Sequence, residues 1–409
     1  MMIRICLNNT LILIIVWEFV LTLPELSSKT VYDATRGDIK TIGFIANSHG
    51  KCKPDFIYFL LRHGSRNFGP STAGKIEAFL KKFNALIEEG SIQLSQEIIW
   101  YRDWNKGIYY DDYELVMEGM MEHYMIAKRY KEKFPDLFPS YSISNYSLEA
   151  TSKMRTIQSA MSFMYGLLQG KGPLGSSMSR LDIQMKGYMP PGIIIKKDEE
   201  NRLLRFVDCC PKYKKYIKSL QWKEEGDLFD YTKDFDSVVR SVSLSLNFDV
   251  TKDDVIALYY LCAAELMSPS QANGSHFCNI FTSNDISVLD YSKDLDKYYK
   301  YSYGFKTNYK MSCLLLSDVI DKLNNSNHNH PVLKFAHEET VLPLLTLMGL
   351  FDDKKILTHK TKEYYNRKLK TSRVIPFAGN VAFIRYSCQK DVQQRIQVTN
   401  WVNYGDQLY

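Results

Sequence analysis

Two arginines and a histidine stand close together in the short segment Arg62-His63-Gly64-Ser65-Arg66. A guanidinium group is a planar, forked donor that can bind two oxygens of one phosphate. A neutral imidazole between two such groups could attack the phosphorus atom that they hold and form a covalent phosphohistidine. The segment therefore suggests phosphoryl transfer, with His63 as the nucleophile and the two arginines binding the phosphate.

The residues just before this segment predict the element that positions it. Residues 55–61 read DFIYFLL, an apolar, aromatic-rich run that follows Pro54 and is typical of a buried strand. In open α/β sheets, ligands bind outside the carboxyl ends of strands. We therefore expect the segment 62–66 to lie at the edge of a sheet, where it can line a ligand-binding cleft.

A strand followed by the pattern R-H-G-x-R resembles the signature of the histidine acid phosphatases. A second segment, residues 334–351, reads KFAHEETVLPLLTLMGLF and resembles the H-A-E-T-L-L-P-L block of the multiple inositol polyphosphate phosphatases, one branch of that superfamily. Further segments similar to this branch are 204–209 (LRFVDC), 303–305 (YGF) and 374–380 (VIPFAGN). The similarity extends from about residue 30 to about residue 398, nearly the whole chain.

This resemblance implies an enzyme that hydrolyses phosphomonoesters of inositol polyphosphates, including inositol hexakisphosphate, through a phosphohistidine on His63. It implies that Arg62 and Arg66 bind the phosphate. Family members carry a third phosphate-binding arginine in an S-x-x-R setting, which Arg155 matches in the segment ATSKMRT. Its position near a predicted helix N-terminus also favours anions. The resemblance makes His337 a second phosphate-binding imidazole.

Two adjacent glutamates could donate the proton that the leaving alkoxide needs. Consecutive helical residues point about a quarter turn apart, so only one of Glu338 and Glu339 can face the phosphate. The His-Ala-Glu pattern of the inositol polyphosphate branch selects Glu339, whereas the His-Asp pattern of other branches would select Glu338. We predict Glu339 as the acid. No metal or other cofactor is expected, because the arginines supply the positive charge.

One position departs from the pattern of the resembled family. The family continues R-x-P after the second arginine, whereas here Phe68 stands at the place of the proline and Pro70 follows two residues later. Proline would stiffen the loop that holds Arg66, whereas phenylalanine could pack there, with Pro70 partly compensating. This departure keeps open the alternative of a catalytically weakened secreted protein that binds phosphate ligands. Independently of Phe68, a general acid phosphatase of broad specificity is the alternative within the enzyme class.

The pattern of strands and helices predicts an α/β fold, a mixed sheet flanked by helices, with an inserted, mainly helical domain. The α/β phosphatase domain is predicted at 28–169 and 328–409, and the inserted domain at 170–327. A ligand cleft at such a domain junction is a common arrangement. Within the predicted helix 152–168, helical spacing predicts one core-facing stripe, formed by Met154, Ile157, Met161, Met164 and Leu168.

Residues 1–27 are interpreted as a secretory signal peptide. An uncharged stretch follows Arg4 and is too short to span a bilayer. Three N-x-S sequons, at Asn145, Asn273 and Asn324, are typical of glycoproteins of the secretory pathway. Because no KDEL-like signal is present, we expect a secreted or endoplasmic reticulum luminal protein without a membrane span after removal of the signal peptide.

The chain has eight cysteines, of which seven remain after the predicted leader is removed. One disulfide is predicted between Cys52 and Cys388, because the strands that carry them should be neighbours. A second is predicted between Cys278 and Cys313. One member of the vicinal pair at 209–210 is expected to stay a free thiol, because vicinal cysteines cannot easily bond to each other.

Charge does not point to a nucleic-acid partner. The chain carries 52 basic and 46 acidic residues, a formal net charge of +6, and these charges are dispersed. A dense basic arm of the kind that binds nucleic acids is lacking, and no cysteines or histidines have zinc-site spacing. The expected partner is a small, polyphosphorylated substrate.

Overall fold

The computed structural model describes most of the chain, and every structural statement below refers to that part. The described residues are 5–7, 10–14, 24–36, 52–95, 98–102, 104, 113–139, 142, 145–170, 191–269, 276–325, 330–362, 364–388 and 394–400. Much of the predicted signal peptide and the sequon at Asn273 lie outside these ranges.

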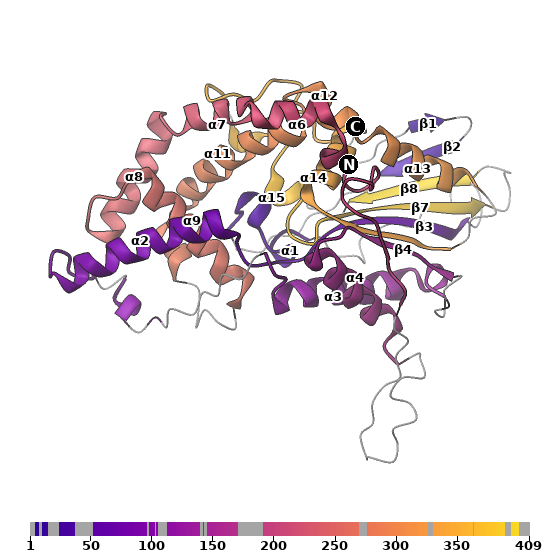
Figure 1. The fold of residues 1–409 in the computed structure, drawn as a ribbon, viewed down its shortest axis with the longest axis horizontal. Coiled ribbons are helices and arrows are strands. Elements are labelled where there is room, and N and C mark those ends of the chain that lie inside the picture. Colours follow the sequence, from indigo (N-terminus) through magenta and orange to yellow (C-terminus); the bar gives the residue numbers. More distant parts are fainter. Residues whose placement is uncertain are drawn as a thin grey trace, which may run out of the picture.

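A mixed sheet of eight strands occupies one half of the molecule, at the right in Figure 1. The strand order is β1-β2-β8-β7-β3-β6-β4-β5. β3 is central, pairs in parallel with β6 and antiparallel with β7, and β4 runs parallel to β6. The strands are β1 (Ile5–Leu7), β2 (Thr10–Ile14), β3 (Cys52–Arg62), β4 (Ser147–Ala150), β5 (Ile194–Ile195), β6 (Val332–Ala336), β7 (Asn380–Cys388) and β8 (Gln394–Asn400).

Helices cover both faces of this sheet and extend beyond it. The α-helices are α1 (Tyr32–Thr35), α2 (Pro70–Glu88), α3 (Met117–Lys133), α4 (Met154–Leu168), α5 (Phe206–Cys209), α6 (Pro211–Lys218), α7 (Glu224–Phe229), α8 (Lys233–Leu246), α9 (Lys252–Met267), α11 (Ser283–Tyr301), α12 (Lys306–Lys310), α13 (Cys313–Asn324), α14 (Glu338–Leu347) and α15 (Thr371–Val374). Short 3-10 helices are η1 (Ser27–Lys29), η3 (Ile99–Arg102), η4 (Pro135–Leu137), η7 (Gln221–Lys223), η8 (Phe277–Ile280) and η9 (Tyr364–Asn366). None of the described helices is long and apolar enough to cross a bilayer.

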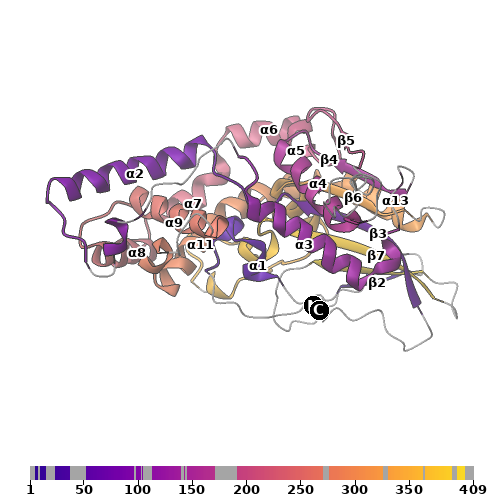
Figure 2. The same cartoon turned by 90° about the horizontal axis from the view of Figure 1, so that it is seen from below.

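The side chains of β3 alternate between two apolar clusters, as expected for a strand that is buried on both faces. One face packs with α3 and α4, which lie side by side below the sheet (Figures 1 and 2), and the other packs with α13 and α14. The first set is Ile57, Phe59 and Leu61, and the second is Phe56, Tyr58 and Leu60. The predicted buried strand is therefore confirmed.

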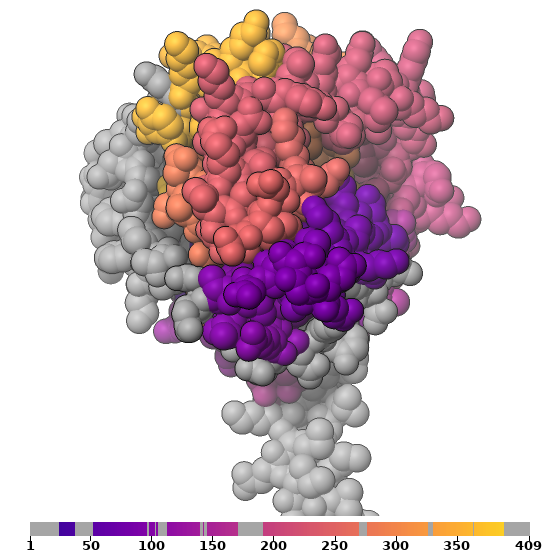
Figure 3. All heavy atoms as spheres, turned by 90° about the vertical axis from the view of Figure 1, so that its left-hand side faces the viewer, coloured from indigo at the N-terminus to yellow at the C-terminus, as the bar shows by residue number. Residues whose placement is uncertain are grey.

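A mainly helical part extends from one end of the sheet and contains α7, α8, α9 and most of α11 (Figure 1). The helix α2 packs against α9 through Ile76, Phe79 and Phe83, and Figure 3 shows α2 as a ridge beside these helices. By contrast α13, from within the predicted insertion 170–327, packs on β3 and β7. The predicted fold class, a mixed sheet flanked by helices, is confirmed, whereas the bounds of the inserted, mainly helical domain stay a prediction.

The predicted core-facing stripe of α4 is only partly correct. Met164 and Leu168 are buried, but Met154 and Met161 are 60% and 51% exposed. The buried face of this helix is centred on Phe163, and at 3.6 residues per turn the two exposed methionines lie on the opposite side. The spacing of apolar residues alone therefore does not show which side of α4 is buried and which is exposed.

One predicted disulfide is wrong. Cys278 is bonded to Cys262 rather than to Cys313, which is an exposed free thiol at the start of α13. The reason is that η8 packs against α9, which brings the Cα atoms of the two bonded cysteines to 4.5 Å. The bridge therefore ties α9 to the segment that follows it.

The disulfide predicted between Cys52 and Cys388 assumed that their strands are neighbours, and β3 and β7 are indeed paired. Cys52 is disulfide-bonded, and the register of β3 and β7 places it opposite Cys388. Both members of the vicinal pair, Cys209 and Cys210, are free thiols. The prediction of one free thiol in this pair is therefore correct for one member and misses the other.

Two glycines allow α3 to approach the segment after β3 closely. A Cβ atom on Gly64 would lie 2.2 Å from the carbonyl oxygen of Gly119, and a Cβ on Gly119 would lie 2.1 Å from the carbonyl oxygen of Ser65. Both obstacles are backbone atoms, which cannot rotate away. The first turn of α3 is therefore fixed against the segment 62–66, and any side chain at either position would separate them.

We expect Gly119→Ala to destabilise the fold by about 1–3 kcal/mol, because the added methyl group overpacks against backbone. The matched control is Gly74→Ala in α2, where a Cβ has nothing within 4 Å. That change should be neutral or stabilise by about 0.5–1 kcal/mol through helix propensity. Urea unfolding of both variants measures the difference, and equal midpoints would contradict the close contact.

Candidate active site

Three neighbouring parallel strands, β3, β6 and β4, end at the same edge of the sheet. The next residues along the chain are His63, His337 and Thr151, respectively. The backbone N–H of His63 donates to the carbonyl of Ala336 (3.0 Å), and that of Thr151 donates to the carbonyl of Phe335 (3.2 Å). The parallel pairing therefore continues beyond the strands and aligns the two candidate imidazoles, whose ring centres lie 5.5 Å apart.

The tautomer of His63 follows from a single hydrogen bond. Its Nδ1 lies 2.9 Å from the carbonyl oxygen of Gly64, which can only accept, so Nδ1 carries the proton. Burial, followed by the charges of Arg62 and Arg66, holds the pKa of His63 well below its usual range. The imidazole is therefore neutral, and its Nε2 keeps the lone pair that a nucleophile needs.

Arg62 is almost fully buried, and the protein holds its guanidinium group on several sides. Its Nη1 donates to the carbonyl oxygens of Ser28 (2.8 Å) and Ile375 (2.5 Å). The group lies 4.6 Å from the ring centre of Phe377, and its Nη2 lies 3.3 Å from a carboxylate oxygen of Glu338. Its Nε has no hydrogen-bond partner among the described residues, so a donor of this buried cation is unsatisfied.

Arg66 and Arg155 have no carboxylate within ion-pair distance among the described residues. Instead they share Tyr113, whose ring centre lies 4.7 Å from the guanidinium carbon of Arg66 and 5.6 Å from that of Arg155. Burial, followed by repulsion from Arg155 and Arg62, lowers the pKa of Arg66 to about 9. Cations that repel one another without a counterion form a site that favours an anion. No sequence pattern marks Tyr113 as part of the site.

His337 is fully engaged with its neighbours. It occupies the N-cap position of α14, and its Nε2 lies 2.8 Å from the hydroxyl of Thr151, which in turn contacts that of Thr156. Its Nδ1 lies 3.4 Å from Nη2 of Arg155, which can only donate. Nε2 therefore carries the proton of the neutral ring. Burial is the main reason why the pKa of His337 is lowered to about 3.

Glu339 lies beside His337 and is held by Arg205. The Nη1 of Arg205 donates to Oε1 of Glu339 at 2.7 Å, while its Nε donates to Asp208 at the same distance. Burial alone would raise the pKa of Glu339, but electrostatic interactions with the His337 ring and with Arg205 bring it to about 2. The sequence pattern does not predict this role of Arg205, although the segment 204–209 resembles the inositol polyphosphate branch.

Glu338 points to a different set of cations. One of its carboxylate oxygens pairs with Lys297 of α11, and the other faces Arg62. Burial opposes ionisation, but Lys297 and then Arg62 hold the pKa of Glu338 well below its usual range. The two adjacent glutamates therefore diverge, as predicted for consecutive helical residues.

A buried glutamate that the sequence analysis did not identify holds the loop after His63. Glu122 of α3 accepts hydrogen bonds from the backbone N–H and the hydroxyl of Ser65, at 2.7 and 2.9 Å, and from the N–H of Tyr32. Burial raises the pKa of this carboxyl group to about 7. No local sequence pattern marks Glu122, because its partners are distant in the chain.

The departure from the family pattern at Phe68 does not leave the loop loose. Phe68 is buried and packs edge-on against Tyr260, with ring centres 5.4 Å apart. Backbone hydrogen bonds between 65–67 and 114–116 hold the loop. Pro70 starts α2, so it is a helix-initiating residue rather than a substitute for the missing proline.

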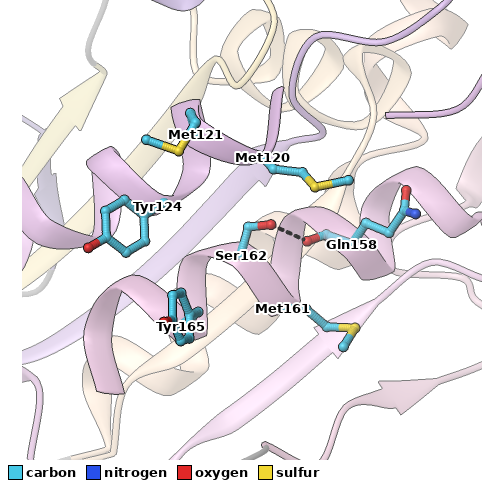
Figure 4. A pocket seen from close by; sticks show the side chains of 7 residues that line it. All are labelled: Met120, Met121, Tyr124, Gln158, Met161, Ser162 and Tyr165. Atoms are coloured by element: carbon cyan, nitrogen blue, oxygen red, sulfur yellow. Dashed lines mark hydrogen bonds between the residues drawn. The ribbon is translucent and has the colours of Figure 1, made fainter. Parts of the chain in front are cut away.

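A pocket of about 640 Å³ between α3 and α4 does not suit phosphate chemistry. Figure 4 shows methionine and tyrosine side chains around it, with no charged group to bind an anion. Its lining consists of Met120, Met121, Tyr124, Gln158, Met161, Ser162 and Tyr165. Among the described residues, no group of three or more histidines, cysteines and carboxylates could hold a metal ion.

The structure thus brings together all six predicted site residues at one edge of the sheet: Arg62, His63, Arg66, Arg155, His337 and Glu339. The arrangement combines two neutral imidazoles, three guanidinium groups and one carboxylate, and Glu338 adds a second carboxylate beside Arg62. It can neutralise a phosphate dianion, attack its phosphorus atom and supply a proton to a leaving group.

Comparisons with known proteins agree with this chemistry. Residues 55–400 match the model of the histidine phosphatase superfamily, branch 2. The human multiple inositol polyphosphate phosphatase 1 is 28% identical over 83% of this chain and 72% of its own length. The protein of that name from Drosophila melanogaster is 26% identical over 93% of this chain and 82% of its own length.

Solved structures share the fold. The multiple inositol polyphosphate phosphatase of Bifidobacterium longum in complex with inositol hexasulfate has a TM-score of 0.68 at 16% identity, covering 92% of this chain and 91% of its own. The phytase from D. castellii has a TM-score of 0.70 at 19% identity, covering 92% of this chain and 79% of its own. The chain belongs to branch 2 of the histidine phosphatase superfamily and is a phosphoric monoester hydrolase.

Proposed function

We propose that this protein hydrolyses inositol polyphosphates, including inositol hexakisphosphate, through a phosphohistidine on His63. The observation that carries the mechanism is the neutral imidazole of His63, with Nδ1 bonded to Gly64 and Nε2 free among arginines. The substrate class is supported by the relatives named multiple inositol polyphosphate phosphatase, which match most of the chain.

In the first half-reaction, Nε2 of His63 attacks the phosphorus atom and the bond between phosphorus and the inositol oxygen breaks. Arg62, Arg66 and Arg155 bind the phosphoryl oxygens, where negative charge must be stabilised in the transition state. Glu339 gives its proton to the departing alkoxide, so the inositol leaves as a neutral alcohol.

In the second half-reaction, the ionised Glu339 takes a proton from water as the water oxygen attacks phosphorus. The bond between phosphorus and Nε2 breaks, inorganic phosphate leaves, and both residues return to their initial states. One carboxyl group therefore serves first as acid and then as base.

This role requires Glu339 to be protonated when substrate is bound, although its pKa is about 2 in the free protein. A phosphate dianion beside it raises the pKa of a carboxyl group by like-charge repulsion, and competes for the arginines that stabilise the carboxylate. Glu338 is less suited, because Lys297 and Arg62 already pair with its two oxygens.

We also propose that the protein acts in the secretory pathway, as the predicted leader and sequons indicate. The disulfide between Cys262 and Cys278 supports an oxidising compartment.

His63→Ala should reduce phosphatase activity by about 10³-fold or more, because no other group can replace the nucleophile. Rapid quenching of the wild-type protein with labelled substrate should trap phosphate on His63, detectable by mass spectrometry after alkaline digestion. Wild-type binding of inositol phosphates with hydrolysis no faster than that of His63→Ala would favour a binding protein instead.

Glu339→Gln should lower kcat about 100-fold or more on alkyl phosphates, which leave poorly, and much less on an aryl phosphate, which needs little protonation. Glu338→Gln is the matched control, since it removes the same charge from the adjacent residue. Its effect should not depend on the leaving group. A larger leaving-group dependence for Glu338→Gln would assign the acid to Glu338.

The substrate class is tested by comparing kcat/KM for inositol hexakisphosphate and for 4-nitrophenyl phosphate, with His63→Ala as the blank. We expect at least about a 10-fold preference for the inositol ester, the effect of one additional charged contact. Equal or greater efficiency on the aryl ester would identify a general acid phosphatase.

A further inference from the structure

Two lysines lie near the arginines that are proposed to bind the phosphate. We propose that Lys29 of η1 and Lys297 of α11 form a second phosphate-binding position, which holds a neighbouring phosphate of the same substrate. This inference rests on the proposed function and deepens it, because it names residues that would distinguish a polyphosphate from a monophosphate.

Lys29 reaches the site along the ring of Phe377. Its Nζ lies 5.8 Å from the centre of that ring, which is 4.6 Å from the guanidinium carbon of Arg62 and 6.0 Å from the ring centre of His63. The backbone also connects these groups, because the N–H of Phe377 donates to the carbonyl of Thr30, the residue after Lys29. One aromatic side chain therefore contacts the nucleophile, an arginine of the site and Lys29.

The segment that carries Lys29 is held firmly in place. The N–H of Ser27 donates to Asp290 at 2.6 Å, and its hydroxyl donates to Asp294 at 3.1 Å. Both carboxylates also pair with the buried Arg367. A lysine at an ordinary surface position has no such anchoring, so the position of Lys29 beside the site is fixed before substrate arrives.

Lys297 lies on the last turns of α11. It pairs with Glu338, whose other carboxylate oxygen faces Arg62. Lys29 itself has no ion pair among the described residues. Burial, followed by the charge of Arg66, lowers its pKa well below the usual range, while Glu338 opposes this shift. The carboxylate of Glu338 thus interacts electrostatically with three cations: Lys29, Lys297 and Arg62.

The distribution of charge differs between the two sides of the site. On the side of Arg205, the carboxylates of Glu339, Asp208 and Asp198 balance the cations. On the side of Lys29 and Lys297, Glu338 is the one described carboxylate that forms ion pairs with the cations, while Asp296 attracts Lys297 without forming an ion pair. The surplus positive charge therefore lies on this second side, which is where a further phosphate of the substrate would be bound most strongly.

The test uses Lys29→Met in the full chain, because this change removes a charge without leaving a carboxylate unpaired, unlike Lys297→Met. Binding is measured by calorimetry in a His63→Ala background, so that no substrate is consumed. We expect the affinity for inositol hexakisphosphate to fall about 10-fold or more, and the affinity for inorganic phosphate to change less than about twofold, because it occupies only the first position.

Two controls accompany this measurement. Lys355→Met removes the same charge from an exposed lysine and should leave both affinities unchanged, while Lys29→Arg should retain the affinity for inositol hexakisphosphate. An unchanged affinity for this ligand in Lys29→Met, an equal loss for inorganic phosphate, or no binding of the hexakisphosphate at all would overturn the proposal. Failure of the proposed function appears separately, as a wild-type protein that binds the hexakisphosphate but does not hydrolyse it.

Discussion

The parallel pairing of β3 with β6 is the constraint on which the candidate site depends. It places the residues after the two strands at one edge of the sheet, and the hydrogen bond from His63 to Ala336 extends the pairing by one residue. Neither imidazole could be positioned by its own strand alone. Because β3 is buried on both faces, a slip in this register would turn apolar side chains toward the wrong cluster, so the core enforces the alignment of the site.

The site stores unfavourable electrostatic interactions that the surrounding structure must offset. Burial destabilises the charged forms of Arg62, Arg66 and Arg155, and repulsion from other arginines adds to this effect at Arg66 and Arg155. Backbone carbonyls, Phe377 and Tyr113 hold these groups in place without cancelling their charge. A phosphate therefore enters a site whose donors are already oriented, which lowers the reorganisation needed during reaction.

The sequence predicted the fold and the site correctly where the chemical groups lie within one short, recognisable pattern. The buried strand, the segment 62–66 and the divergence of the two glutamates all follow from short-range rules. Arg205, Glu122 and Tyr113 could not be found in this way, because each acts on a residue far away in the chain and no local spacing marks it. The same limit explains why the predicted partner of Cys278 is wrong, since the packing of η8 on α9 decides which cysteine lies nearby. It also explains why the exposure of the methionines of α4 was not predicted.

The groups that form hydrogen bonds with Arg62 and His63 belong to residues both before and after β3 in the sequence. Ser28 lies before the strand, whereas Ile375, Ala378 and Gly379 lie more than 300 residues after it and complete the hydrogen bonds of the two residues. A ribosome must therefore synthesise nearly the whole chain before the catalytic centre can exist. Contacts of such long range are slow to form, so the emerging polypeptide passes through a long period in which these buried cations lack their final partners. Assistance from chaperones would be most valuable during that interval.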